Sequence, residues 1–61
     1  MLIRTVDGII YALDTKNHII SGGVFREKTK YLFARMIIGA EGYVLLPNGR
    51  EVNLPLVECY V

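Results

Sequence analysis

The sequence has very few of the residues on which most catalytic and metal chemistry depends. It contains one cysteine and one histidine, Cys59 and His18, which lie far apart in the chain. One of each cannot close a tetrahedral metal site, and no third residue is placed to orient a base beside a nucleophile. Neither Gly22-Gly23 nor Gly39–Gly42 has the spacing of a phosphate-binding loop. A single cysteine allows no internal disulfide and is typical of a reducing compartment. We therefore expect no enzyme, no metal and no cofactor, and a cytoplasmic location.

Long uncharged runs and a strong net charge are also lacking. The longest stretch without Lys, Arg, Asp or Glu, from Asn17 to Phe25, is 9 residues, whereas a helix that spans a bilayer needs about 20 apolar residues. No basic start followed by an apolar run resembles a secretory signal. The net charge of +1 creates no field strong enough to indicate an anionic partner. We expect no membrane partner.

The chain does have a large share of apolar residues. Hydrophobic residues make up 52% of its 61 positions, although a 60-residue domain buries only about 60% of the surface of its unfolded chain. A chain this short should be more polar than average, so some apolar side chains must remain on the surface. Such surfaces usually mark self-association or a docking site for another protein. The sequence therefore predicts one small domain, residues 1–61, that forms a homo-oligomer and binds an unidentified protein.

Two dipeptides, Asp7-Gly8 and Asn48-Gly49, each stand between two apolar runs and predict β-hairpins. The four runs are Leu2–Val6, Ile9–Leu13, Tyr43–Leu46 and Glu51–Leu54. Two-residue turns with both central residues at positive φ would place Arg4 opposite Tyr11 and Leu45 opposite Val52.

The middle of the chain, residues 25–38, favours a helix. It is rich in helix formers, and Gly39 stands where a helix stop belongs. At helical spacing one apolar stripe forms, made of Phe25, Thr29, Leu32, Phe33, Met36 and Ile37. The tail Leu56–Val61 follows Pro55 and favours a short edge strand. The predicted fold is α+β: a small antiparallel sheet of two hairpins plus a C-terminal strand, with one central helix. An all-β small barrel is the alternative.

One local stretch resembles a known repeat. The residues Asp7-Gly8-Ile9-Ile10-Tyr11-Ala12-Leu13-Asp14 are similar to the strand-turn signature of the quinoprotein-type β-propeller repeat. The glycine and tryptophan that follow in that repeat are missing here, where Asn17-His18 and Ile20-Ser21 stand instead. The resemblance implies strands around Asp7 and Asp14 and implies no cofactor.

Self-association is our first functional prediction, and it describes a non-enzymatic accessory or regulatory protein. Its interface would combine apolar residues of the predicted helix and of the last strand. The residues expected there are Phe33, Met36, Ile37, Ile38, Val57, Tyr60 and Val61. The last strand would pair with its symmetry mate, which is a common way to cover an exposed sheet edge.

Nucleic-acid binding by an oligomer is the alternative. The segment 26–35 carries a local charge excess, and an aromatic ring among basic residues offers a stacking surface for a base. The residues expected to bind are Arg26, Lys28, Lys30, Tyr31 and Arg35. A solvated outer helix face, on which Lys and Arg stems cover apolar surface, explains the same pattern.

Overall fold

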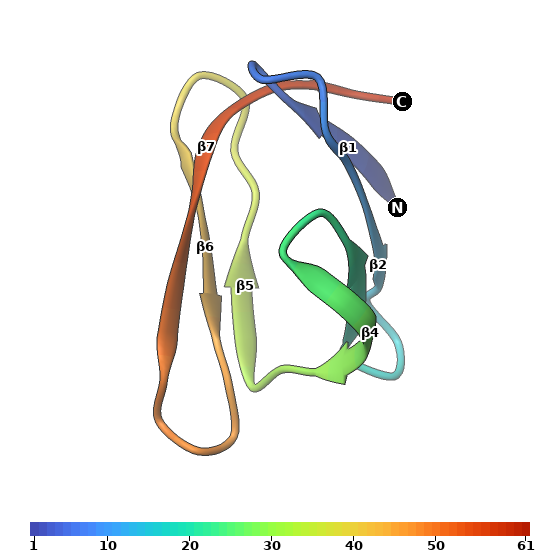
Figure 1. The fold of residues 1–61 in the computed structure, drawn as a ribbon, viewed down its shortest axis with the longest axis vertical. Coiled ribbons are helices and arrows are strands. Elements are labelled where there is room, and N and C mark those ends of the chain that lie inside the picture. The colour runs from blue at the N-terminus through green and yellow to red at the C-terminus, as the bar shows by residue number, and fades with distance from the viewer.

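The computed structural model describes all 61 residues and contains seven β-strands and no helix (Figure 1). The strands are β1 (Leu2–Thr5), β2 (Ile10–Asp14), β3 (Ile19–Gly22), β4 (Phe25–Lys30), β5 (Phe33–Arg35), β6 (Glu41–Leu45) and β7 (Glu51–Tyr60). They form one sheet in the order β4-β3-β2-β1-β7-β6-β5, and every neighbouring pair is antiparallel. The sheet curls so that its two halves face each other across the core (Figure 1).

The predicted helix over 25–38, and with it the α+β class, is wrong. Residues 25–30 form β4 and residues 33–35 form β5, so the all-β class of the alternative is the correct one. The turn at Gly22-Gly23, where both residues have positive φ, sends the chain back antiparallel to β3. In β4, Arg26, Lys28 and Lys30 alternate with Thr29 and other residues, which suits the two-residue period of a strand. Tertiary pairing overrides helix propensity here, because a short helix gains little from propensity alone.

Both predicted hairpins are present, but their registers differ from the predicted ones by one residue. Ile3 rather than Arg4 pairs with Tyr11, and Val44 rather than Leu45 pairs with Val52. The reason is the turn type.

Each turn has three residues rather than two. The Thr5 N–H donates to the Ile9 carbonyl at 3.0 Å, and only Gly8 in that turn has positive φ. In the second turn the Leu46 N–H donates to the Arg50 carbonyl at 2.9 Å. A three-residue loop that ends in a left-handed glycine shifts the pairing by one position relative to a two-residue turn.

The last strand is not at an edge of the sheet, so the prediction that Leu56–Val61 forms an edge strand and pairs with its symmetry mate is wrong. Strand β7 lies between β1 and β6 in the sheet order. Its first half pairs with β6 as far as Leu56, and its second half pairs with β1 from Val57 to Tyr60. Pro55 falls in the irregular part of the β6–β7 pairing, between Asn53 and Leu56, where a missing N–H costs no regular ladder bond.

The core lies between the two halves of the curled sheet. Its ten buried hydrophobic residues are Ile3, Tyr11, Leu13, Ile20, Phe25, Tyr31, Met36, Val44, Leu54 and Val57. Strands β1 and β2 alternate between buried and outward residues, as in β1, where Ile3 and Thr5 are buried and Leu2 and Arg4 are exposed. The rings of Tyr11 and Phe25 meet edge to face, with centroids 6.3 Å apart. The outward residues therefore define the surfaces on which a partner would bind.

Candidate functional site

Four exposed apolar residues stand on two segments that meet, the segment after β5 and the end of β7. Ile37, Ile38, Tyr60 and Val61 are 53%, 51%, 53% and 64% exposed. The Tyr60 hydroxyl donates to the Met36 carbonyl at 2.8 Å, and Ile38 forms a backbone bridge with β7. These contacts hold residues 36–38 against the last strand. We call Ile37, Ile38, Tyr60 and Val61 the apolar end.

The other three residues predicted for an interface lie elsewhere. Met36 and Val57 belong to the buried core, so neither is available to a partner in the folded monomer. Phe33 is 52% exposed but lies on β5, with Tyr43 of β6 as its neighbour. The predicted interface set thus divides into the apolar end, two core residues and one residue on the outer face of the sheet.

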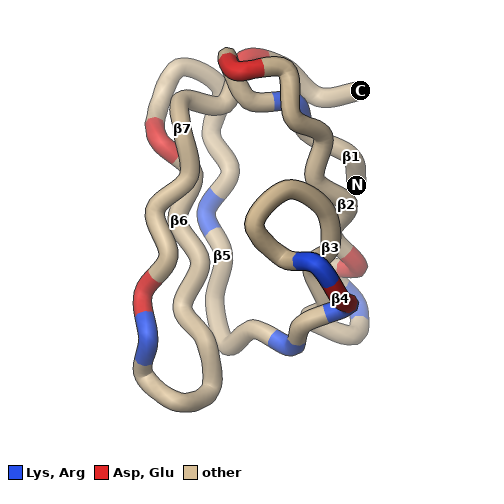
Figure 2. The backbone as a smooth tube through the Cα atoms, viewed as in Figure 1, with Lys and Arg blue, Asp and Glu red and all other residues tan.

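The basic segment also divides when it is folded. Arg26, Lys28 and Lys30 occupy alternate positions of β4. The β3–β4 register shifts within this stretch, and Arg26 and Lys28 line different hollows. Arg35 lies on β5, on the other half of the sheet, and Figure 2 shows its basic segment well separated from those of β4. Tyr31 is buried, with its ring stacked on His18 at a centroid distance of 5.0 Å. Its ring is already covered on one face, so it offers little surface to a nucleobase.

A second set of side chains forms a small cluster on the outer face of β5, β6 and β7. Directly paired residues project to the same side of a sheet, so the pairs Phe33–Leu45 and Arg35–Tyr43 share one face. The Phe33 and Tyr43 rings lie 6.1 Å apart with their planes tilted by 54°. The Arg35 guanidinium carbon lies 5.6 Å from the centre of the Tyr43 ring. We call Phe33, Arg35 and Tyr43 the aromatic platform.

Tyr43 is held in place at both its ring and its hydroxyl. The hydroxyl donates to the carboxylate of Glu51 at 3.1 Å, and Arg35 covers part of the ring. Partial burial raises the pKa of Tyr43 above its usual value, and the hydrogen bond to Glu51 adds to the rise. Phe33 has no such partners and presents its ring to solvent. The platform therefore combines one fixed ring, one exposed ring and one cation.

Sequence reasoning included Phe33 and Arg35 in separate predicted sites and missed Tyr43. The two segments are brought together by the pairing of β5 with β6. The spacing of Phe33 and Arg35, two positions apart in a short strand, was a signal that they share one face. Nothing local in the sequence identifies Tyr43 as their neighbour.

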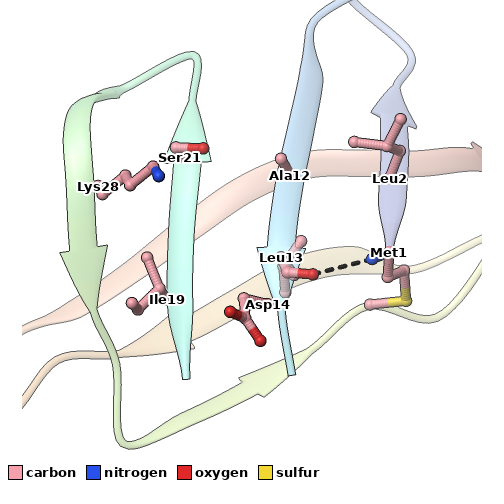
Figure 3. Close-up of a pocket in the computed structure, with 8 residues that line it drawn as sticks. All are labelled: Met1, Leu2, Ala12, Leu13, Asp14, Ile19, Ser21 and Lys28. Atoms are coloured by element: carbon pink, nitrogen blue, oxygen red, sulfur yellow. Dashed lines mark hydrogen bonds between the residues drawn. The ribbon is translucent and has the colours of Figure 1, made fainter. Parts of the chain in front are cut away.

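A shallow hollow of about 230 Å³ lies on the outer face of β1 to β4 (Figure 3). The residues that line it are Met1, Leu2, Ala12, Leu13, Asp14, Ile19, Ser21 and Lys28. The small side chains of Ala12 and Ser21 form its floor, between Leu2 on one side and Lys28 on the other (Figure 3). Its volume is below the roughly 300–1,000 Å³ of pockets that enclose drug-sized ligands. We therefore assign it no small-molecule ligand.

A wider and more open hollow, of about 560 Å³, lies beside the first hairpin. Asp7, Ile9, Tyr11, Gly23, Val24, Arg26 and Pro55 line it. One Asp7 carboxylate oxygen already accepts hydrogen bonds from the Thr5 hydroxyl and the Ile9 N–H. The Thr5 hydrogen bond lowers the pKa of Asp7 below its usual value, so the group is ionised near neutral pH. The Asp7 carboxylate therefore serves to hold the turn of the first hairpin.

The residues most often used in catalysis are not assembled into a site. His18 stacks on Tyr31, while Cys59 pairs with Arg4 in the sheet and its thiol is free. No three His, Cys, Asp or Glu side chains are close enough together to hold a metal ion. The structure has no helix long and apolar enough to cross a membrane.

Comparison with known proteins finds no family model, no curated protein and no solved structure that matches this chain.

Proposed function

We propose that this chain is a small non-enzymatic accessory protein of the cytoplasm that acts after binding a second copy of itself through the apolar end. The observation that carries the proposal is that four large apolar side chains, each more than half exposed, stand on two segments tied together by hydrogen bonds. Burial of such side chains away from water lowers the free energy of the system. The free thiol of Cys59 supports the reducing compartment.

The fold does not need a partner to be compact. Its accessible surface is 4051 Å², and a monomer of this mass has about 4,000 Å². The surplus apolar side chains therefore lie on the surface of a folded monomer. They do not line an open core that only a partner could cover. Self-association would then be a property of the folded monomer, with an affinity that depends on the exposed side chains.

A second copy fits the apolar end better than a strongly charged partner does. The four side chains carry no charge, and a net charge of +1 gives little repulsion between two copies. A standard interface buries about 800 Å² per partner, roughly a fifth of the 4051 Å² surface, so a dimer interface would extend from these four residues to their neighbours. In a two-fold dimer the same patch serves both copies, so one cluster is sufficient.

The experiment is sedimentation velocity from low micromolar to several hundred micromolar protein. The double variant Ile37→Glu/Ile38→Glu places two carboxylates in the apolar end. The matched control is Val6→Glu/Val24→Glu, since both valines are also more than half exposed and the charge change is the same. Circular dichroism confirms that each variant is folded.

We expect the parent and the control to form dimers in this range. The variant in the apolar end should dissociate at least tenfold more readily, because a charge in an apolar interface loses hydration without a partner. A parent that stays monomeric at the highest concentration contradicts the proposal. So does a control that dissociates as readily as the variant.

A further inference from the structure

The aromatic platform is a surface that self-association through the apolar end does not use. Phe33 shows more than half of its surface to solvent, although phenylalanine is among the residues most often buried. Its neighbours are an aromatic ring and a guanidinium group. This combination differs from the apolar end, whose four side chains are uncharged.

We propose that the aromatic platform binds single-stranded nucleic acid by stacking one base on the Phe33 ring, with Arg35 contacting the adjacent phosphate. Sheet surfaces that bind single strands use exposed aromatic rings for bases and nearby cations for the backbone. This inference goes beyond the proposed self-association and concerns a different surface.

The geometry of the three residues supports this division of roles. Tyr43 is held by Glu51 and Arg35, so it provides a fixed side wall beside Phe33. Phe33 and Arg35 point to the same side of β5, two residues apart, which separates them by roughly 6.6–6.8 Å along the strand. A base on Phe33 therefore leaves its phosphate within reach of the Arg35 side chain. Arg35 has no carboxylate partner, since the only ion pair in the structure joins Arg4 and Glu58.

Charge on the two sides of the platform indicates where the strand would run. Glu51 lies on the β7 side, bound to Tyr43, and would repel phosphates. The opposite side is β5, which is an outer strand of the sheet. Lys30 precedes Phe33 by three residues, and a basic segment marks the corner where β4 leads into β5 (Figure 2). The nucleic acid should therefore follow β5, away from Glu51.

The ligand should be single-stranded. An exposed ring on a sheet surface reaches a base only when that base is not already stacked in a duplex. One exposed ring and one or two cations predict weak binding that falls as salt rises. Duplex DNA of the same length should therefore bind measurably less than the single strand.

The absence of tryptophan from the chain allows a direct test. Phe33→Trp introduces a single indole at the proposed stacking position, and Val24→Trp introduces one at an exposed residue in the wider hollow. Each variant is titrated with oligo(dT), with an abasic oligomer of the same length, and with duplex DNA at two salt concentrations. Base stacking quenches the indole, whereas phosphate contact alone does not.

We expect saturable quenching of Phe33→Trp by oligo(dT), weaker at high salt, and little quenching by the abasic oligomer or the duplex. Val24→Trp should stay unquenched. In a fluorescence-anisotropy assay with labelled oligo(dT), Phe33→Ala should weaken binding about fivefold or more, in line with the loss of one stacked base. Leu32→Ala, which removes a neighbouring exposed apolar side chain, should not.

Several results would overturn the inference. One is the absence of quenching of Phe33→Trp at any oligo(dT) concentration, and another is equal quenching by the abasic oligonucleotide. A third is a change in Phe33→Trp emission with protein concentration when no oligonucleotide is present. The last result would mean that a second copy covers the platform. The Ile37→Glu/Ile38→Glu variant should still bind oligo(dT), so failure of the dimer and failure of the platform are distinguishable.

Discussion

The imidazole of His18 lies flat on the ring of Tyr31, with centroids 5.0 Å apart and planes within 5° of parallel. The Tyr31 N–H also donates to the His18 carbonyl at 2.9 Å. These two contacts fasten the turn between β2 and β3 to the corner between β4 and β5. The corner leads directly into β5, so the position of the aromatic platform depends on this pair.

The ring of His18 stabilises the fold by stacking, whereas its backbone conformation is strained. Two substitutions separate these two effects. Its φ of 55° is in the left-handed region, where a non-glycine residue costs about 1–2 kcal/mol. His18→Ala keeps the strain and loses the stack, so we expect a loss of about 1 kcal/mol. His18→Gly loses the stack but relieves the strain, and should be about 1 kcal/mol more stable than His18→Ala.

Urea unfolding of both variants measures these differences. Lys16→Ala, in the same turn and exposed, serves as the control and should change stability by less than about 0.5 kcal/mol. If the alanine and glycine variants are equally stable, the positive φ of His18 is not a source of strain.

The phenol of Tyr31 should make the fold sensitive to alkaline pH. Burial raises the pKa of Tyr31 above its usual value of 10.0, and the negative charge of Asp14 adds to the rise. The folded state therefore keeps the phenol proton at a pH where the unfolded chain has released it. This contribution to stability is complete below pH 10 and is lost as pH rises through the folded pKa.

Tyr31→Phe removes the titrating group and keeps the ring. We expect the variant to lose less stability than the parent between pH 9 and 11, as followed by thermal unfolding. Identical alkaline slopes would show that the Tyr31 phenol ionises equally in the folded and unfolded chains.

Turn positions were predictable from the sequence because a left-handed glycine is a local requirement. Gly8 and Gly49 both have positive φ, and both lie between runs that form strands. The register was not predictable, because the same dipeptide suits a two-residue and a three-residue turn. One extra turn residue moved the partner of Tyr11 from Arg4 to Ile3.

The middle of the chain could not be assigned because its partners lie far away in the sequence. Residues 25–30 become a strand by pairing with β3, and residues 33–35 by pairing with β6. Helix propensity is a weak prior against such pairing. The exposure of Ile37, Ile38, Tyr60 and Val61 agrees with the expected surplus of surface apolar residues. The burial of Met36 and Val57 depends on the fold of the whole chain.

Asp14 should stabilise the fold at neutral pH and lose this effect in acid. Its carboxylate accepts hydrogen bonds from the side-chain amide of Asn17 at 2.9 Å and from the N–H groups of Lys16 and Asn17 at 3.1 Å. The amide of Asn17 is the main cause that lowers the pKa of Asp14 below its usual value of 3.8. The contribution is therefore present above pH 3.8 and is lost as pH falls through the lower folded pKa.

Asp14→Asn tests this contribution. The variant should unfold at a lower temperature than the parent at pH 7, and the difference should shrink as the pH falls below 3.8. Asp7 accepts comparable hydrogen bonds from Thr5 and Ile9, and Asp7→Asn should follow the same pH dependence. If the difference in unfolding temperature between parent and variant stays constant in acid, the charge of the carboxylate does not stabilise these turns.

Gly22 is a position where a side chain would collide with the backbone of a neighbouring strand. Its φ is 103°, and a Cβ atom there would lie 2.5 Å from the carbonyl oxygen of Ile10 and 3.3 Å from the Cα of Tyr11. Both of these are backbone atoms of β2, so relief requires the two strands to move apart. Gly8 has a similar φ of 85°, but nothing lies within 4 Å of the position of its Cβ. A side chain at either position would be strained by the positive φ, but only a side chain at Gly22 would also collide with β2.

Comparison of Gly8→Ala with Gly22→Ala isolates that collision. Gly8→Ala should cost about 1–2 kcal/mol through its backbone conformation alone. Gly22→Ala should cost roughly 1–3 kcal/mol more, as overpacking does in a close-packed interior. For a domain of this size each kcal/mol lowers the melting temperature by about 4–8 °C, so scanning calorimetry resolves the difference. If Gly22→Ala melts at the temperature of Gly8→Ala or above it, β3 does not approach β2 as closely as the structure has it.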